Sequence, residues 1–549
     1  MKLPTKSLMA LIVVSIFLLS LAPLEAGTRR IAPSQNGPSA LFPGTPAFKH
    51  RAFYLHCGWA FDHPFAPRSW SRTDYDDVFK FLKRLGFDTV MYWPQIEAIP
   101  APVSPPDARE LERIRDIIGD ARTAGLACWM AMTPNLVSPA ELAAKPFIDR
   151  NPYKHYLTVH LDDPKQAESY LAHRSAMLRI VNNADAYVTI DGDPGGYEGA
   201  KPEDWLRVLL SDRAVIESYG TDPRRQMVIP WVWAGWGARV PVWQDDPTPF
   251  SRAAISLFKK RLPEPWLMLP GRCHKDGWGN GRINLALAEE LGVIDRSMIL
   301  CYEAIEFEPT SPASVLQFDL IRRILKEELY LAPMAYGVMG NAQQPIMRLP
   351  NIYFFARGSW DPAYLNRSDD DVLKDFADFL GGPREELALA WKCLALPLTS
   401  LPRDLPGRLR RVRLNGEPAA FLPGGAKRYL EILAAQTASR IGVLEAIDKP
   451  AADDGECARR VADGTAAFVS WWSMHHYVMD GDPGMGFSWE FVRRDQTILL
   501  ADWAVRNARD RSSVTAAAAG ILVKMHVLEK GAANAAVKAL FELGKPAGS

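Results

Sequence analysis

The most reactive pattern in the sequence is a pair of aspartates, Asp191 and Asp193, directly after the apolar stretch AYVTI at residues 186–190. In an extended backbone, residues two apart share a side, with their Cα atoms about 6 to 7 Å apart. Gly192 lets the backbone turn sharply and approach a ligand. A neighbouring like charge raises the pKa of one of the two carboxyl groups, so that one can stay protonated while the other is ionised. The pair could then place a general acid and a stabilising carboxylate on either side of one reacting sugar carbon. A calcium-binding loop and an ordinary turn are the alternative interpretations.

Further polar and aromatic residues follow other apolar stretches of the chain. Glu303 is a third candidate for catalysis, with pairing to an arginine as its alternative role. Aromatic rings stack on the CH face of a sugar, and core packing explains such rings equally well. For His56 the alternative is a buried structural imidazole. The candidate substrate contacts are His56, Trp93, Trp231, Trp233, Tyr336, Asn341 and Gln344.

These candidates must be positioned by the elements that precede them. Between residues 51 and 345, apolar stretches of strand length alternate with segments of helical periodicity. The alternation predicts eight strands and an α/β fold, a (β/α)8 TIM barrel, whose catalytic groups lie at the carboxyl ends of the strands. The eighth strand is expected at 330–340, with Tyr336 near its carboxyl end. An open doubly wound sheet is the alternative architecture.

The fourth predicted strand carries the paired aspartates, so its orientation decides where they point. The alternate residues from Ala186 to Ile190 form an apolar set that we expect to face the helices. Tyr187, Thr189 and both aspartates would then point into the barrel.

The two ends of the chain differ in character from the barrel. Residues 346–549 show helical periodicity without strand signals, which predicts an all-α C-terminal domain. Lys2 and Lys6 precede an apolar run and small residues near Ala26, as in an export signal. We therefore expect a signal peptide at 1–26, a linker at 27–50, and a secreted or periplasmic (cell-envelope) location. The run is short for a membrane span, and an uncleaved anchor is the alternative.

The composition narrows the choice of partners. The 64 Lys+Arg balance the 64 Asp+Glu, which gives no electrostatic reason to expect a nucleic-acid partner. The 6 cysteines include no C-x-x-C pair, and no metal-ligand spacing accompanies them. We predict neither a metal nor another cofactor and expect a carbohydrate substrate, with the oligomeric state left open.

One segment of the chain, residues 336–382, resembles a known family. In the hyaluronidase-like β-N-acetylglucosaminidases of the O-GlcNAc hydrolase type, the end of the barrel has an Asn-rich string with a Gln. An aromatic, strand-like piece and a Trp-(Asn/Asp)-Pro-x-x-Tyr motif follow it. The residues that match this pattern are Asn341, Gln344, Trp360, Asp361, Pro362 and Tyr364. The resemblance, in which a barrel is followed by helices, covers roughly residues 50 to 450.

The resemblance implies roles for three residues. Asp191 would orient the 2-acetamido group of the substrate, whose own oxygen attacks the anomeric carbon. Asp193 would protonate the leaving oxygen, and Asn341 would bind the sugar or its acetamide. The family has adjacent acids, whereas Gly192 separates them here.

That departure keeps other activities open. A retaining glycosidase with Asp193 as acid and base and Glu303 as nucleophile would need carboxyl groups about 5 Å apart. A noncatalytic carbohydrate-binding barrel and a metal-dependent lyase or esterase are further alternatives.

Overall fold

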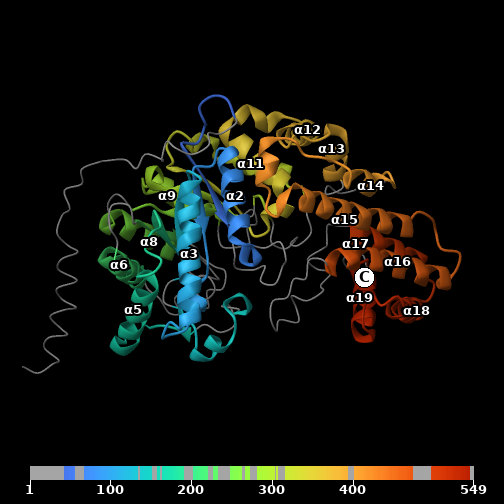
Figure 1. The fold of residues 1–549 in the computed structure, drawn as a ribbon, viewed down its shortest axis with the longest axis horizontal. Helices are drawn as coiled ribbons and strands as arrows, with labels where there is room; N and C mark the ends of the chain where they lie inside the picture. The colour runs from blue at the N-terminus through green and yellow to red at the C-terminus, as the bar shows by residue number, and fades with distance from the viewer. Residues whose placement is uncertain are drawn as a thin grey trace, which may run out of the picture.

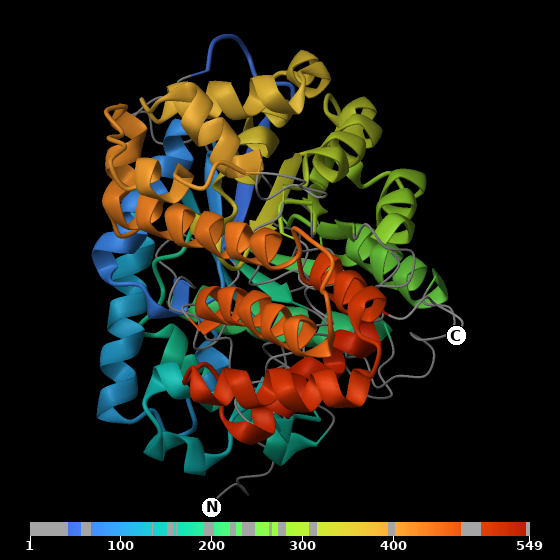
Figure 2. The same cartoon turned by 90° about the vertical axis from the view of Figure 1, so that its right-hand side faces the viewer.

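Figures 1 and 2 show the ribbon of the protein in a computed structural model. The structure describes residues 42–55, 67–133, 136–150, 157–160, 163–190, 202–219, 227–232, 248–262, 266–272, 281–302, 304–306, 316–392, 401–473 and 496–544.

Eight parallel strands form a barrel in which the first strand pairs with the last. Their order is closed, β1-β10-β9-β8-β7-β6-β3-β2. The predicted α/β class is confirmed, and the closed order differs from that of an open doubly wound sheet. The strands are β1 (His50–Leu55), β2 (Thr89–Tyr92), β3 (Ala127–Met132), β6 (Ala186–Ile190), β7 (Met227–Val232), β8 (Leu269–Arg272), β9 (Met298–Cys301) and β10 (Gly337–Ala342). Because the strands are parallel, their carboxyl ends meet at one end of the barrel.

Helices surround the strands and bury the outer face of the barrel (Figure 1). Ser71 caps the first of them, and its side chain and that of Asp74 each accept a hydrogen bond from the other's backbone N–H. These helices are α2 (Arg72–Arg84), α3 (Pro105–Thr123), α5 (Pro164–Leu178), α6 (Pro202–Tyr219), α8 (Thr248–Arg261), α9 (Gly281–Glu290) and α10 (Phe318–Glu328). A short antiparallel pair, β4 (Leu136–Val137) and β5 (Leu157–Thr158), lies between β3 and β6 in sequence.

Alternate residues of each strand fill the inside of the barrel. The interior cluster contains Ala52, Tyr54, Met91, Trp93, Trp129, Ala131, Ala186, Val188, Ile190, Leu267, Leu269, Met298, Leu300, Tyr302 and Met339. Tyr187 instead packs in the cluster that joins the barrel to its helices, and its hydroxyl donates to the carbonyl of Val181. The predicted orientation of the fourth strand was therefore wrong, because its apolar set faces inward. Both faces of a parallel barrel strand are buried, so polarity does not mark the inner one.

The eighth barrel strand begins later than predicted. Strand β10 starts at Gly337, and residues 329–331 form the short helix η7 (Leu329–Leu331). Tyr336 precedes the strand and stacks on His50 at the start of β1, with ring centroids 4.3 Å apart. Tyr336 therefore lies at the amino end of the barrel, which corrects its predicted place at the carboxyl end.

After β10 the chain passes through η8 (Pro345–Met347) into α11 (Leu349–Trp360). The aromatic stretch of α11 is helical, whereas the family that residues 336–382 resemble has a strand-like piece there. Part of the predicted linker packs against this helix, because the ring of Phe42 meets Trp360 edge-on, with centroids 5.9 Å apart.

The described residues from Leu349 onward contain helices and no strand. Figure 2 shows several of these helices crossing in front of the barrel. A second apolar cluster lies among the helices between Gly425 and Leu543, separate from the core of the barrel. None of the helices within the described ranges is both long and apolar enough to cross a bilayer. The helices after α11 are α12 (Asp369–Phe379), α13 (Arg384–Lys392), α14 (Leu405–Leu409), α15 (Gly425–Ala446), α16 (Asp454–Ser473), α17 (Gln496–Asn507), α18 (Arg511–Lys524) and α19 (Lys530–Leu543).

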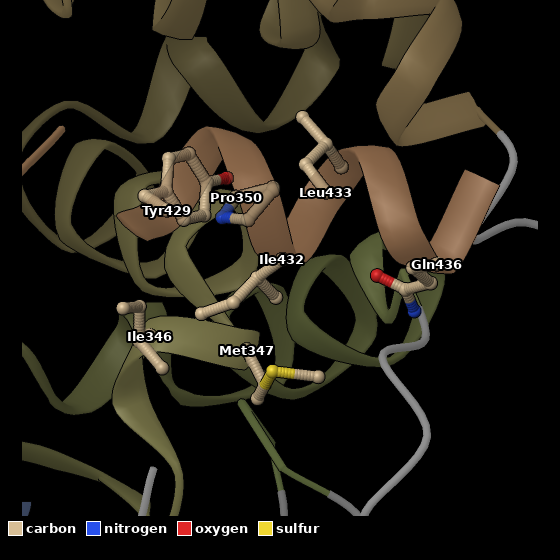
Figure 3. A pocket seen from close by; sticks show the side chains of 7 residues that line it. All are labelled: Ile346, Met347, Pro350, Tyr429, Ile432, Leu433 and Gln436. Atoms are coloured by element: carbon tan, nitrogen blue, oxygen red, sulfur yellow. The ribbon is translucent and has the colours of Figure 1, made fainter. Parts of the chain in front are cut away.

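Helix α15 reaches the carboxyl end of the barrel. It forms a small, mostly apolar pocket with η8 and the start of α11 (Figure 3). The pocket is lined by Ile346, Met347, Pro350, Tyr429, Ile432, Leu433 and Gln436. Since η8 directly follows β10, α15 braces the segment that leaves this strand.

Candidate active site at the carboxyl end of the barrel

Asn341 and Gln344 lie at the carboxyl end of β10. Asn341 is two residues beyond the inward-facing Met339 and pairs in register with Tyr54 of β1. Its side chain therefore shares the interior side of the barrel with the Tyr54 ring. Asn341 and Gln344 are both 0% exposed. Within the described part of the chain, neither atom of the Gln344 side-chain amide has a hydrogen-bond partner.

A buried carboxylate fixes the backbone at this point. Glu306, in the segment after β9, accepts hydrogen bonds at Oε2 from the backbone N–H groups of Gln343 (2.5 Å) and Gln344 (3.1 Å). Its other oxygen lies 3.6 Å from Nη2 of Arg348, and both side chains are fully buried. Burial lowers the pKa of Arg348, and the Glu306 charge opposes that shift. The carboxylate thus joins the ends of two neighbouring strands.

A second buried carboxylate lies beyond β2. Glu97 accepts a hydrogen bond at Oε1 from the backbone N–H of Thr133, directly after β3. Nη1 of Arg174 lies 3.5 Å from Glu97 Oε1. Burial raises the pKa of Glu97, and the Arg174 charge counteracts part of this rise. Trp93 itself is 0% exposed inside the barrel.

Arg174, on α5, connects this second carboxylate to others. It donates to the carbonyl of Thr133, and its Nε lies 3.6 Å from Asp212 of α6. The hydroxyl of Tyr170 donates to Asp212 over 2.7 Å and also accepts from Arg174. Burial would lower the pKa of Arg174, but Tyr170, Asp212 and Glu97 outweigh it and raise that pKa. These groups form a connected buried network.

The structure therefore brings Trp93, Asn341 and Gln344 to the carboxyl end of the barrel and places Tyr336 at the other end. Trp231 belongs to β7, but its side chain lies outside the described part of the chain. Asp191, Asp193, Glu303, His56 and Trp233 lie outside the described residues.

The sequence placed Glu97 and Glu306 just beyond two of the predicted strands but gave neither residue a role in the site. Each lies a few residues beyond a buried strand, Glu97 without another acid close by and Glu306 between Glu303 and Glu308, and that was the available signal. Their arginine partners lie on helices or helix starts, with nothing in the local sequence to link them. Among the described residues, no group of three His, Cys, Asp or Glu side chains could hold a metal ion.

Comparisons with known proteins yield weak structural likenesses. No protein-family model and no curated protein matches the chain. CpGH84B is 12% identical, with a TM-score of 0.44, over 78% of this chain and 73% of that one. An O-GlcNAc hydrolase of Thermobaculum terrenum is 13% identical, with a TM-score of 0.44, over 91% of this chain and 95% of that one. A β-N-acetylhexosaminidase of Bacteroides fragilis is 11% identical, with a TM-score of 0.35, over 58% and 66%. Likenesses at this level do not assign a function.

Proposed function

We propose that this protein is a secreted glycoside hydrolase that acts on glycans containing N-acetylhexosamine. The observation that carries the proposal is the Gln344 amide, which is 0% exposed at the carboxyl end of a closed barrel and has no hydrogen-bond partner in the described chain. A buried amide without partners costs free energy, and a ligand with matching donors and acceptors would remove that cost. An acetamido group offers one N–H and one C=O, which is the complement of such an amide.

Aromatic and polar side chains at the carboxyl end of β10 and β1 suit a sugar. Asn341 offers a second amide on the interior side, and the Tyr54 ring lies in register beside it. A carbohydrate needs hydrogen-bonding groups around its hydroxyls and a flat apolar surface against its CH face. A barrel can supply both at the carboxyl ends of its strands.

The proposed mechanism assigns the chemistry to the two aspartates that follow β6. Asp193 donates a proton to the glycosidic oxygen as the bond to the anomeric carbon breaks. Asp191 accepts a hydrogen bond from the acetamido N–H and orients the carbonyl oxygen that attacks this carbon. Water then opens the cyclic intermediate, and Asp193 takes up its proton. These roles rest on the resemblance of residues 336–382 to the O-GlcNAc hydrolase type.

The test is hydrolysis of a panel of aryl glycosides with and without a 2-acetamido group. We expect the aryl N-acetylhexosaminide to be cleaved. Asp193→Asn should lower kcat by at least about a hundredfold, because general acid catalysis contributes at this scale. The far-UV circular dichroism spectrum of the variant should be unchanged. A fully active Asp193→Asn would remove Asp193 from the acid role. Export is tested separately, by N-terminal sequencing of protein recovered from outside the cytoplasm.

A retaining glycosidase with Glu303 as nucleophile is a second candidate, favoured by the anchoring of the sequence around Glu303. Asn351 of α11 donates to the carbonyl of Ile305 over 3.0 Å, and Glu306 is clamped to the end of β10. Anchoring of this kind suits a nucleophile, which must be held in place to react. This candidate gains if substrates lacking the acetamido group are cleaved equally well and Glu303→Gln abolishes their hydrolysis.

A further inference from the structure

Glu306 belongs to a segment held on two sides. The carboxylate accepts both backbone N–H groups that follow Ala342, at the point where β10 ends. The neighbouring carbonyl of Ile305 accepts from Asn351, whose side-chain oxygen in turn accepts from the backbone N–H of Gln317. The ends of β9 and β10 are thereby fixed to each other and to the start of α11.

This arrangement sets the path of the chain between Asn341 and Gln344. Asn341 is fixed by its strand, because it pairs in register with Tyr54. Gln344 lies beyond the strand, so its backbone position depends on Glu306. The side chain of Ile305 also touches the strand, since a Cβ on Gly340 would lie 2.5 Å from Ile305 Cδ1. A shift of Glu306 would therefore move Gln344 relative to Asn341.

The chemistry of the buried Glu306–Arg348 ion pair indicates that it does more than fill space in the core. A buried ion pair is often no more stabilising than apolar side chains of the same volume. The Arg348 guanidinium has Glu306 as its one carboxylate within the described chain, at 3.6 Å, and its nitrogens lack other hydrogen-bond partners there. What the pair does provide is a fixed direction for two consecutive backbone N–H groups.

We propose that Glu306, held by Arg348, is a positioning residue that sets the Gln344 amide against Asn341 for recognition of the substrate's acetamido group. This inference rests on the proposed function. Glu306 acts through the backbone of residues 343 and 344 and does not itself touch the sugar.

The experiment compares Glu306→Gln with wild-type protein on aryl N-acetylglucosaminide and aryl glucoside. Glutamine has nearly the same size but carries one acceptor oxygen and no charge. We expect kcat/KM for the acetamido substrate to fall about tenfold or more, mainly through KM, because small misplacements of a binding group have effects of this size. The ratio of kcat/KM between the two substrates should fall with it.

A purely structural role would lower the amount of folded enzyme and leave KM and the substrate ratio unchanged. Asp107→Asn is the matched control, because it also changes one carboxylate of a buried ion pair. Asp107 lies in the first turn of α3 and its carboxylate is 2.7 Å from the guanidinium of Arg150, which directly follows η4 (Phe147–Asp149). This control variant should lose stability with KM unchanged. If Glu306→Gln does not fold, Arg348→Lys serves in its place, because it keeps a cation but not the planar guanidinium.

The outcomes separate this inference from the proposed function. If wild-type protein is active and Glu306→Gln keeps both its KM and its substrate ratio, the positioning role is wrong while the hydrolase stands. If the wild-type protein cleaves no glycoside of the panel, the proposed function fails and the positioning role falls with it.

Discussion

Glu97 and Glu306 occupy matching places on either side of β1. Glu97 follows β2 and binds a backbone N–H just beyond β3, whereas Glu306 follows β9 and binds two N–H groups just beyond β10. In the closed order of strands, β2 and β10 are the two neighbours of β1. Both carboxylates are fully buried beside a buried arginine. The barrel uses the same device twice to join the ends of adjacent strands.

The two arginines differ in their surroundings. Arg174 lies near two carboxylates, Glu97 and Asp212, and also contacts the Tyr170 hydroxyl and the Thr133 carbonyl. Within the described chain, Arg348 has one carboxylate close by, that of Glu306 at 3.6 Å. The side-chain amide of Gln344, four residues earlier, has no hydrogen-bond partner among the described residues. A well-connected buried network serves stability, whereas unmet hydrogen-bonding capacity is a cost that proteins retain at functional sites. Oε2 of Glu97 and Nη1 of Arg174 also lack hydrogen-bond partners in the described chain. In the Arg348 guanidinium and the Gln344 amide, however, every nitrogen and oxygen lacks one, and this larger deficit favours the β10 side as the place for a ligand.

Removing each arginine should give the largest contrast between the two sides. We expect Arg174→Met to lower the free energy of unfolding by about 3–5 kcal/mol, because it leaves two buried carboxylates without a cation. Arg348→Met should cost less, about 2 kcal/mol, since Glu306 keeps two backbone N–H donors. Urea unfolding followed by circular dichroism measures both values.

Arg72→Met is the control for loss of an arginine ion pair at the surface. Arg72 is about half exposed and pairs with Asp116 and Asp120, so its loss should lower the free energy of unfolding less than the loss of either buried arginine. Equal losses for Arg174→Met and Arg348→Met would contradict the distinction between the two sides.

Low pH should reduce the stability of the Glu97 side by protonating His173, which precedes Arg174 on α5. Burial, together with the Arg174 charge, lowers the pKa of His173 from 6.5 to about 4. The unfolded chain therefore takes up a proton first, so this contribution to stability is complete above pH 6.5 and is lost as the pH falls toward 4. At about 1.4 kcal/mol per pKa unit, the loss approaches 3 kcal/mol.

His173→Gln should remove that part of the pH dependence. The measurement is the urea midpoint of both proteins at several pH values between 7 and 4. The difference in midpoint between variant and wild type reports on His173 alone. Burial raises the pKa values of Glu97 and Asp212, so these two groups change the stability in the opposite direction as the pH falls, and their effect cancels in the difference. Parallel midpoint curves for the two proteins would show that His173 is not the acid-sensitive group.

The order of the strands could be read from the sequence, but their orientation could not. Apolar stretches separated by helical periodicity sufficed to count eight strands. In β6, however, Tyr187 and Val188 are both buried, on opposite faces, so polarity gave no sign of the inner side. The start of β10 was placed too early because YLAPMAY is as apolar as the strand that follows it.

The candidate site was predictable only where strand ends carry amides or aromatic rings. Asn341 and Trp93 were selected because they follow apolar stretches directly, and Gln344 was selected through the resemblance of residues 336–382 to a known family. The role of Glu306 could not be found this way, since the N–H groups that it binds lie 37 and 38 residues further along the chain. Only closure of the barrel brings these groups together, and a strand-by-strand interpretation contains no such information.

The smallest effect, and the sharpest test of the β10 side, concerns Gln344 itself. We expect Gln344→Met to raise the free energy of unfolding by about 1 kcal/mol, because it replaces a buried amide without described partners by an apolar side chain of similar size. The same variant should weaken binding of N-acetylglucosamine, measured by isothermal titration calorimetry. Substitution of a residue that serves ligand binding is expected to raise the stability of the protein and to lower its function.

A matched variant on the Glu97 side controls for the loss of any buried polar group. Tyr170→Phe removes a hydroxyl that donates to Asp212 and accepts from Arg174, so it should destabilise by about 1–2 kcal/mol and leave sugar binding unchanged. The two variants should therefore move the unfolding midpoint in opposite directions. If Gln344→Met is destabilising as well, the Gln344 amide serves the fold, and the contrast between the two sides of β1 loses its functional meaning.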